Sequence, residues 1–399
     1  HGVVISDEFM QIIENATRFE GYDDSWDLID PHSGEVKKTV SAKTLWVKLI
    51  QNRVETGEPY IMFKDTIDEA MPAFQKRLGL EVHQSNLCSE ITLPTDKDRT
   101  AVCCLSSVNL EEYDEWKYND MFIPDLVRML DNVLTYFIEN SDPSLHRAAY
   151  SAMRERSIGL GAMGFHAYLQ RHNIPFESPM AKGRNLQMFT RIKGEAVRAT
   201  ENLAMERGAC PDDINGRVRN AHLLAIAPNA SSSIICGNTS PSIEPYRANA
   251  FTQKTKSGSS LLKNEYLEAV LQDLEQDTEE VWKSIITNSG SVQHLDFLDE
   301  WTKDVFKTAV EIDQRWVIEM AADRQEYICQ SQSLNVFFPS NVSKQELHAI
   351  HMMAWKRGVK TLYYLRSEAF KRAENVSDEA LRELIFESID EEGCLACEG

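Results

Sequence analysis

The order of secondary-structure signals along the chain is the feature that most limits its possible folds. Apolar residues at helical spacing, such as Leu126, Leu130 and Phe137, alternate with short apolar runs typical of strands, such as residues 360–365. The alternation continues over the whole chain. It predicts an α/β fold with a largely parallel sheet, either open or closed into a barrel.

Several elements can be placed more closely. We expect a helix from Ser41 to a C-cap at Gly57, followed by an apolar strand that includes residues 60–63. The cysteine-rich stretch at residues 82–110 is expected to form two strands separated by a polar loop. Residues 262–328 are expected to form helices in an acidic, solvated outer layer.

The composition excludes several classes of function. A formal net charge of -20 over 399 residues argues against a surface that binds nucleic acid or an anionic membrane. No apolar run approaches the roughly 20 residues that cross a bilayer, and no secretory signal is recognisable. We therefore expect a cytoplasmic protein whose cysteines are mostly reduced.

An amide, a thiol and a carboxylate stand at alternate positions, at Asn86, Cys88 and Glu90. If this stretch is extended, the three side chains lie on one face, because side chains of a strand repeat every two residues. A second thiol, Cys103, could lie opposite them. Two thiols beside a carboxylate suit redox chemistry on a bound molecule, whereas a buried structural cysteine needs no such neighbours.

A second cysteine motif is the C-x-x-C pair Cys394 and Cys397, near the end of a charged tail. Such a pair can close to a disulfide and exchange with another disulfide, so shuttling of reducing equivalents is the favoured interpretation. Half of a zinc site is the alternative. The adjacent Cys103 and Cys104 are poorly placed to form the other half, because neighbouring cysteines lack C-x-x-C geometry.

Three further motifs each allow two interpretations. Residues 159–164 match G-x-G-x-x-G, but no acidic residue follows about 20 positions on, so close packing of a strand against a helix is favoured over dinucleotide binding. Residues 229–233 follow a strand candidate at 223–228 and suit either phosphate binding or a plain Ser-rich turn. Tyr363 and Tyr364 suit either strand packing or transfer of a one-electron oxidation.

Taken in order, these segments resemble the large, catalytic subunit of class I ribonucleotide reductase. The similarity extends from about Val3 to the C-terminus. The segments that carry it are residues 86–90, Cys103 before Leu105 and Ser106, the turn at 208–211, residues 228–233 with 243–245, residues 360–364, and the terminal pair Cys394 and Cys397.

The resemblance implies a fold and a domain organisation. Residues 1–372 would form the C-terminal half of a ten-stranded α/β barrel, with Cys88 on a loop or strand inside it. Residues 373–399 would be a flexible acidic tail that carries the redox cysteine pair. In this family the N-terminal half carries the effector-binding regions and the second cysteine of the reducible pair, so we expect a split subunit whose other half is a separate chain.

The resemblance also implies a role for each residue of the reacting site. Cys88 would become a thiyl radical and remove the ribose 3′ hydrogen of a ribonucleoside diphosphate. Glu90 would accept the 3′ hydroxyl proton, and Asn86 would hydrogen-bond the substrate and assist as a proton acceptor. Cys103 would be one of two thiols that reduce the substrate, and Cys394 with its partner in the tail would re-reduce them.

Partners and substrate contacts follow from the same resemblance. Tyr363 and Tyr364 would relay a radical from a tyrosyl radical and di-iron centre in a separate small subunit, so no cofactor or metal is expected on this chain. Thioredoxin or glutaredoxin would reduce the tail cysteines. The substrate phosphates would contact Ala230, Ser231 and Ser232, although Ala230 stands where an acidic residue is expected.

Two alternatives stay open. The chain could be a non-catalytic binding module, a degenerate half-subunit that only binds the small subunit or nucleotides. It could also be a zinc-bound interaction protein. Retention of the thiols and of both tyrosines favours the enzyme.

Overall fold

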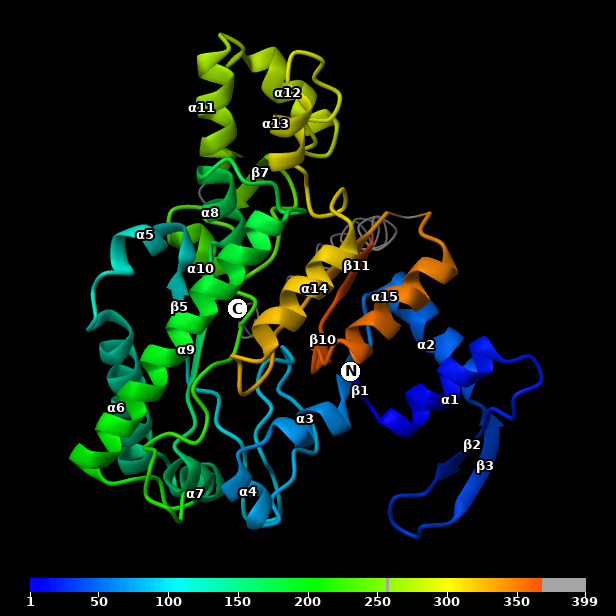
Figure 1. The fold of residues 1–399 in the computed structure, drawn as a ribbon, viewed down its shortest axis with the longest axis vertical. Helices are drawn as coiled ribbons and strands as arrows, with labels where there is room; N and C mark the ends of the chain where they lie inside the picture. The colour runs from blue at the N-terminus through cyan, green and yellow to red at the C-terminus, as the bar shows by residue number, and fades with distance from the viewer. Residues whose placement is uncertain (256–257, 340, 368–399) are drawn as a thin grey trace, which may run out of the picture.

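The computed structural model describes residues 1–255, 258–339 and 341–367, with the side chains of residues 252–260 left undescribed (Figure 1). The predicted tail at residues 373–399, with Cys394 and Cys397, lies outside the described residues. Within the described part, no helix is both long and apolar enough to cross a membrane.

Helices and short strands alternate along the chain. The strands are β1 (Gly2–Ile5), β2 (Ser25–Ile29), β3 (Val36–Ser41), β4 (Tyr60–Phe63), β5 (Leu105–Asn109), β6 (Gly159–Met163), β7 (Ala250–Thr255), β8 (Gly258–Lys263), β9 (Val336–Phe338), β10 (Thr361–Leu362) and β11 (Leu365–Ser367). The helices are α1 (Asp7–Arg18), α2 (Ala42–Thr56), α3 (Lys64–Ala70), α4 (Ala73–Arg77), α5 (Tyr113–Trp116), α6 (Phe122–Asn140), α7 (His146–Glu155), α8 (Phe165–Arg171), α9 (Pro179–Arg207), α10 (Ala230–Ile235), α11 (Glu265–Asp273), α12 (Glu279–Thr287), α13 (Glu300–Val305), α14 (Gln314–Gln325) and α15 (Lys344–Lys356).

The interior strands pair mainly in parallel. β5 pairs with β6, and isolated parallel bridges join Leu160 to Leu224 and Ile226 to Gln332. β9 pairs in parallel with β11, and β1 with β4, whereas β10 pairs antiparallel with β4. The predicted α/β fold is therefore confirmed. Over the described ranges the strands form separate sheets of two or three, and no closed barrel is made.

Glycines allow β6 to pack closely against its neighbours. A Cβ on Gly159 would lie 2.2 Å from the Leu105 side chain, and a Cβ on Gly161 would lie 2.5 Å from the Ala225 carbonyl oxygen. Neither position accepts a side chain without displacement of the neighbouring strand. Residues 159–164 therefore serve close packing, as expected, but the glycines Gly159 and Gly161 pack against neighbouring strand segments and not against a helix.

The predicted helix after Ser41 is also confirmed. The Ser41 hydroxyl accepts a hydrogen bond from the Thr44 N–H and caps α2. The helix ends at Gly57, whose φ of 77° is in the left-handed region that favours glycine. Trp46 and Ile50 point from α2 into the core. The chain then turns directly into β4.

Two sequence expectations are wrong. Residues 82–104 contain no strand, because the first strand of the cysteine-rich stretch is β5. Residues 262–328 are not one solvated layer, since Met320 and Ala321 of α14 are fully buried. α14 packs against α9 and α15, and the Asn185 side chain donates a hydrogen bond to the Met320 carbonyl. Charged residues at the ends of α14 obscure this burial in the sequence.

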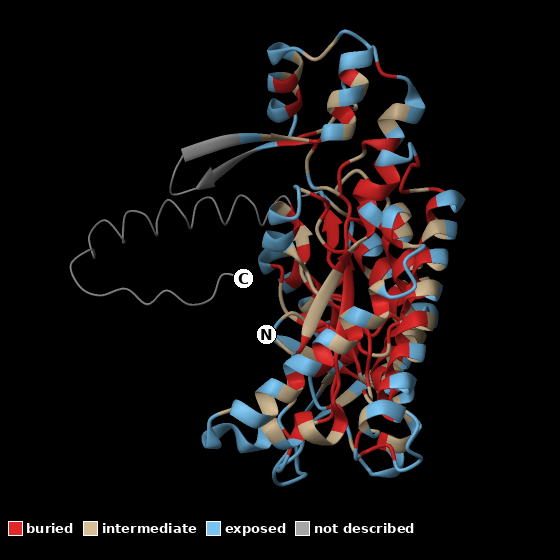
Figure 2. Cartoon of the chain, turned by 90° about the vertical axis from the view of Figure 1, so that its left-hand side faces the viewer, coloured by how far each residue is buried: buried red, intermediate tan, exposed pale blue. Residues whose placement is uncertain are grey.

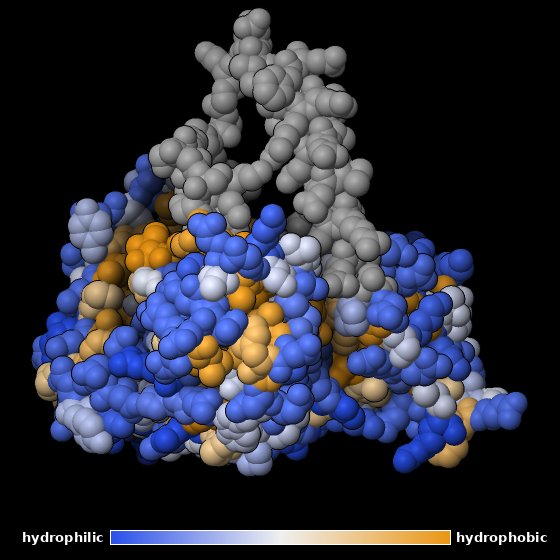
Figure 3. Space-filling view, turned by 90° about the horizontal axis from the view of Figure 1, so that it is seen from above, coloured by the Kyte–Doolittle hydropathy of each residue, from blue (hydrophilic) through white to orange (hydrophobic). Residues whose placement is uncertain are grey.

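Buried residues form a main core and a smaller separate one. The main core runs the length of the molecule between the strands and the helices that cover them (Figure 2). The smaller core joins α11, α12 and α13 through Leu267, Trp282 and Ile285, at one end of the molecule. Hydrophilic side chains cover most of the surface seen from that end, with small apolar patches between them (Figure 3).

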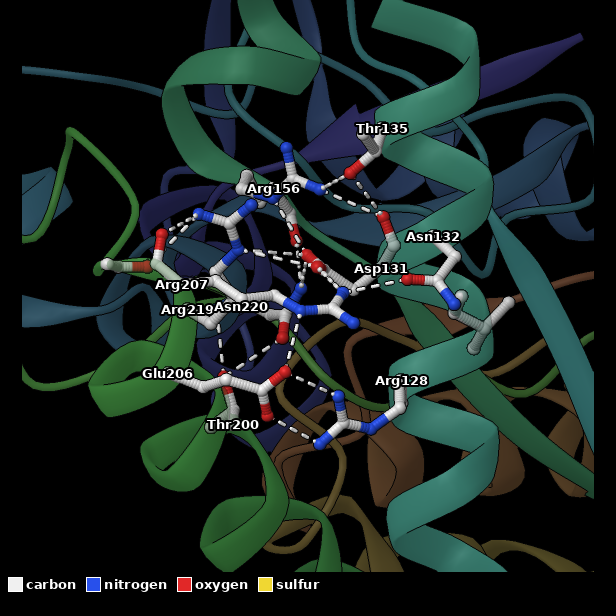
Figure 4. A network of polar contacts seen from close by, with 12 residues as sticks. Arg128, Asp131, Asn132, Thr135, Arg156, Thr200, Glu206, Arg207, Arg219 and Asn220 are labelled. Carbon is white, nitrogen blue, oxygen red and sulfur yellow. Dashed lines mark hydrogen bonds and ion pairs between the residues drawn. The ribbon is translucent and has the colours of Figure 1, made fainter.

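One buried carboxylate ties α6 to the helices behind it (Figure 4). Asp131 of α6 is fully buried and forms ion pairs with Arg156 at 2.7 Å, Arg207 at 3.0 Å and Arg219 at 3.2 Å. Asn220 donates a further hydrogen bond to it at 3.3 Å. Burial alone would raise the pKa of Asp131, but the arginines, with Arg156 foremost, hold it below its usual value.

Candidate active site

Asn86, Cys88 and Glu90 lie on a turn. The Ser89 N–H donates to the Asn86 carbonyl at 3.2 Å, and the Ile91 N–H donates to the Asn86 side-chain oxygen at 3.1 Å. Ser89 has a φ of 70°, which a strand does not allow. The expectation that alternation along a strand gathers the three side chains is therefore wrong. A turn closed by an asparagine side chain gathers them instead.

Residues 331–333 hold this turn from behind. The Ser331 N–H donates to the Glu90 carbonyl at 2.9 Å. The Ser333 hydroxyl lies 2.5 Å from the Cys88 carbonyl and 3.0 Å from Glu90 Oε2. A hydroxyl has one hydrogen, so Ser333 can donate it to ionised Glu90, or donate it to the Cys88 carbonyl and accept a hydrogen bond from protonated Glu90. Ser333 thus accommodates both protonation states of the carboxyl group.

Glu90 is only 2% exposed. Burial raises the pKa of its carboxyl group, and hydrogen bonds from its own backbone, Asn86 and Ser333 reduce the shift without reversing it. A carboxyl group with a raised pKa suits proton exchange near neutral pH better than an ordinary surface carboxylate does.

Cys88 is a neutral thiol in this environment. Burial and the neighbouring Glu90 raise the pKa of the Cys88 thiol, while a hydrogen bond with Tyr363 partly opposes them. The contact joins a sulfur to a phenol, two groups that can exchange a hydrogen atom. A cleft of about 250 Å³ opens beside the turn and is lined partly by Tyr60, Asn86 and Leu87.

Three tyrosine rings form a cluster beside Cys88. The ring centroids of Tyr363 and Tyr364 are 4.4 Å apart, and Tyr60 lies 4.6 Å from Tyr363 and 5.0 Å from Tyr364. Sequence reasoning missed Tyr60. Its position at the start of β4 was predicted, but the antiparallel pairing of β4 with β10 was not, and that pairing brings the three rings together.

Backbone contacts fix the tyrosine pair. The Tyr363 N–H donates to the Leu334 carbonyl at 2.8 Å, and the buried Arg53 donates to the Tyr363 carbonyl at 3.0 Å. The Tyr364 N–H donates to the Asn335 side-chain oxygen at 3.0 Å. Asn335 is held in turn by the buried Glu244. Residues 243–245 belong to the segments that carry the family resemblance, but the sequence did not indicate that Glu244 holds Asn335.

Cys103 and Cys104 face different environments, as expected for adjacent residues. Cys104 is buried, with its sulfur 3.6 Å from the Leu130 carbonyl, whereas Cys103 is exposed. Burial of the Cys103 sulfur region raises the pKa of its thiol to about 12, and Glu90, Cys104 and Cys88 add to the shift. These interactions place Cys103 on the same side as the turn that carries Cys88.

The predicted phosphate-binding residues lie at the start of a short helix. Ala230, Ser231 and Ser232 are exposed in α10, which follows Asn229 with a φ of 53°. The Ser107 hydroxyl of β5 donates to Asn229 at 3.1 Å and ties this helix to the strand after Cys103. The predicted strand before it is reduced to two isolated bridges at Leu224 and Ile226.

The remaining predicted site residues, Cys394 and Cys397, lie outside the described residues. Over the ranges that the structure covers, no three His, Cys, Asp or Glu side chains converge as metal ligands would.

Comparisons with a family profile and with known proteins all point to the same family. The sequence profile of the family described as "Ribonucleotide reductase, barrel domain" matches residues 1–215 and 213–365. The chain is 48% identical over its whole length to a Frog virus 3 (isolate Goorha) protein described as a ribonucleoside-diphosphate reductase large subunit, and covers 69% of it. A large subunit from Invertebrate iridescent virus 3 is 48% identical over 94% of the chain, which covers 59% of that protein.

Comparison with solved structures supports the same family. The fold is similar to that of the Actinobacillus ureae class Id ribonucleotide reductase alpha subunit, with a TM-score of 0.81 and 38% sequence identity. The match covers 92% of this chain and 64% of that structure.

Proposed function

The chain belongs to the ribonucleotide reductase large-subunit family, and we propose that it carries the reacting site of a ribonucleoside-diphosphate reductase. The observation that supports the proposal most directly is the contact of Cys88 with Tyr363, beside the buried Glu90. This arrangement supplies a hydrogen-atom path and a proton acceptor side by side.

The first step is generation of a thiyl radical. A one-electron oxidant in a small subunit would oxidise Tyr364 and then Tyr363, whose rings are in contact. The Cys88 thiol then gives its hydrogen atom to the Tyr363 phenoxyl oxygen, so an S–H bond breaks and an O–H bond forms. The high pKa of the Cys88 thiol favours this transfer, because the hydrogen stays on sulfur until it moves with its electron.

The second step acts on the ribose. The Cys88 radical removes the 3′ hydrogen, and Glu90 accepts the 3′ hydroxyl proton while Asn86 hydrogen-bonds the substrate. Loss of the 2′ hydroxyl as water then takes two electrons from Cys103 and a second thiol, which leaves a disulfide. The Cys88 thiol finally returns its hydrogen atom to C3′, so the thiyl radical is regenerated. The exposed Ala230, Ser231 and Ser232 would contact the diphosphate through N–H and hydroxyl groups.

The proposed reaction needs a second thiol and a reducing cysteine pair that do not lie among the residues described by the structure. Among the described cysteines, Cys104 is the one adjacent to Cys103, and its sulfur points to Leu130 instead. The second thiol is therefore assigned to a polypeptide that supplies the rest of the barrel and the effector sites. Cys394 and Cys397, reduced by thioredoxin or glutaredoxin, would restore both thiols.

A substitution at Cys88 tests the proposal. In a complex of this chain with the rest of the large subunit and the small subunit, Cys88→Ser is expected to abolish formation of deoxyribonucleoside diphosphate. A hydroxyl holds its hydrogen too strongly for the Tyr363 radical to remove it. The exposed Cys236→Ser serves as the control and should keep full activity. Undiminished turnover by Cys88→Ser would refute the proposed role.

A further inference from the structure

Residues 328–335, the linking segment, contact the turn that carries Cys88 and Glu90. The Ser331 N–H donates to the Glu90 carbonyl at 2.9 Å, and the Ser333 hydroxyl lies 2.5 Å from the Cys88 carbonyl. Both serines are fully buried, so water does not replace these bonds. The linking segment therefore fixes the turn from one side.

The linking segment also contacts the stretch that carries the tyrosine pair. The Tyr363 N–H donates to the Leu334 carbonyl at 2.8 Å, and the Tyr364 N–H donates to the Asn335 side-chain oxygen at 3.0 Å. The side chains of Cys88 and Tyr363, which form a hydrogen bond, thus belong to two pieces of chain with one common support. Their separation depends on the conformation of the linking segment.

Lys360 binds the first part of the linking segment through its ammonium group. Lys360 is only 3% exposed. Its Nζ lies 3.0 Å, 2.8 Å and 2.7 Å from the carbonyl oxygens of Ile328, Cys329 and Gln330. A buried ammonium group is costly unless its hydrogen bonds are satisfied, and here each of its three hydrogens has a carbonyl partner. The lysine thereby holds three successive carbonyls around one point.

Thr361, the next residue, extends this contact. Its hydroxyl donates to the Gln332 carbonyl at 2.8 Å, and the Ser331 hydroxyl lies 2.5 Å from the same oxygen. Because Thr361 has used its one hydrogen, Ser331 is the donor in the second contact. Both hydroxyl groups belong to fully buried residues. Lys360 and Thr361 together bind every residue from 328 to 332.

The backbone of Lys360 is anchored to the sheet. The Phe63 N–H donates to the Lys360 carbonyl at 2.9 Å. Lys360 directly precedes β10, and the two residues of that strand, paired with β4, separate it from Tyr363. The lysine therefore joins the sheet that carries Tyr363 to the segment that supports Cys88, and sets the distance between them.

We propose that Lys360, together with Thr361, is a positioning residue for the hydrogen-atom transfer between Cys88 and Tyr363, and that both act through the linking segment. This inference rests on the proposed function. In the transfer the S–H bond of Cys88 breaks and the O–H bond of Tyr363 forms, so one proton and one electron pass from sulfur to the phenoxyl oxygen. Lys360 and Thr361 exchange neither. A displacement of about 1 Å between reacting atoms costs roughly 100-fold in rate.

Amide hydrogen exchange on the 399-residue chain gives the first test. Lys360→Met keeps the length of the side chain and removes its three hydrogen bonds. Exchange, read by peptide mass spectrometry, should become at least about tenfold faster at the Ser331 and Tyr363 N–H groups and stay unchanged in β5. Lys303→Met, at a lysine of α13 whose side chain is 13% exposed, is the matched control and should change neither. Equal exchange in Lys360→Met and the wild type would overturn the proposal.

Turnover of the assembled enzyme gives the second test. Lys360→Met should lower kcat by about 10- to 100-fold and leave KM for the nucleotide almost unchanged, because the lysine does not touch the substrate. The solvent deuterium isotope effect on kcat should exceed that of the wild type, because the thiol and phenol hydrogens exchange with solvent and their transfer becomes rate-limiting. Wild-type kcat, or a lower kcat without a larger isotope effect, would overturn the positioning role.

A threonine variant decides the question if Lys360→Met does not fold. Thr361→Val is nearly isosteric and removes both hydrogen bonds of the hydroxyl, so it should lower kcat and raise the isotope effect in the same way. Thr200→Val removes a buried hydroxyl that donates to Asn220 at 3.0 Å, and should do neither. Cys88→Ser separates the two proposals. Turnover by Cys88→Ser would refute the proposed function, whereas full turnover by Thr361→Val and an inactive Cys88→Ser would refute the positioning role alone.

Discussion

At the scale of single residues, the proposed reacting site combines a carboxyl group, a thiol and a phenol, and burial raises the pKa of each. Burial raises the pKa of Glu90, of Cys88 and of the Tyr363 phenol. Neutral Cys88 and Tyr363 suit transfer of a hydrogen atom, because no charge has to be desolvated, and the raised pKa of Glu90 makes its carboxylate a stronger base.

Glu90 leads to a prediction about pH. As a base it must be ionised, so turnover of the assembled enzyme should fall as pH decreases through a pKa above the ordinary glutamate value. Glu90→Gln should lower kcat by at least about 100-fold, the usual contribution of a positioned acid–base group. It should also abolish the fall of turnover at low pH, which is the acidic limb of the pH–rate profile. Steady-state rates from pH 5 to 8 measure both effects. Exposed Glu81→Gln is the control, and an unchanged limb in Glu90→Gln would contradict the assignment.

Tyr60 leads to a second prediction. Its hydroxyl group lies among those of Tyr363 and Tyr364, and burial raises its pKa so that it stays protonated. Tyr60→Phe keeps the ring packing and removes only the hydroxyl, so the melting temperature should change little while turnover falls about fivefold. A hydrogen bond of roughly 1 kcal/mol sets that scale. Tyr113→Phe, a buried ring elsewhere, should leave turnover intact, and equal activities of the two variants would exclude a role for Tyr60.

At the scale of elements, the connection between α2 and β4 is what brings these residues together. α2 ends at Gly57, and β4 begins three residues later, paired with β1 on one side and β10 on the other. The register of β4 with β10 sets Tyr363 against Tyr60. A short strand between two partners therefore fixes the tyrosine cluster.

Gly57 allows a test of this connection. Its φ of 77° disfavours any side chain, and a Cβ would lie 3.1 Å from the Tyr364 ring. Gly57→Ala should lose about 1–2 kcal/mol of stability from the left-handed backbone and also lower turnover through Tyr364. Gly79→Ala is a matched control, because its φ of 70° is similar and a Cβ there meets nothing within 4 Å. Urea unfolding and turnover assays separate the two effects, and equal turnover of both variants would argue against contact with Tyr364.

At the scale of the whole molecule, buried ion networks join helices that are distant in the sequence. Asp131 links α6 to α9 and to the segment before the Leu224 bridge. Arg99, near the reacting turn, pairs with the buried Asp212 at 2.7 Å, and so does Arg154 at 2.8 Å. These contacts fix α6, α7 and α9 to the loops that contain Arg99, Asp212 and Arg219.

Removal of the Asp131 charge should therefore be costly. Asp131→Asn leaves Arg156, Arg207 and Arg219 without their common partner, and we expect a loss of about 3–5 kcal/mol. Because the pKa of Asp131 is lowered on folding, its contribution is present above the unfolded pKa of about 3.9 and is lost as pH falls through the folded value. Asp125→Asn, on the exposed side of α6, is the control. Chemical unfolding at pH 7 and pH 3 measures the difference, and wild-type stability of Asp131→Asn at pH 7 would refute the prediction.

Much of the fold followed from local signals. The cap residues Ser41 and Gly57, the helical spacing around Leu126 and the close packing at residues 159–164 are encoded by neighbouring residues, and each was predicted correctly. The turn at Cys88 was not, because an asparagine side chain replaces the strand hydrogen bonds there and the sequence pattern is the same.

By itself, the sequence determined the α/β class, the family and the residues Asn86, Cys88, Glu90, Cys103, Tyr363 and Tyr364 as candidates, because residue chemistry and order along the chain suffice for these. Only the tertiary structure decided that Tyr60 joins the tyrosine pair, that Ser333 supports Glu90, and that Lys360 binds the backbone carbonyls of residues 328–330. Each of these contacts joins segments far apart in the sequence, and strand register and burial, which no local pattern specifies, bring them together.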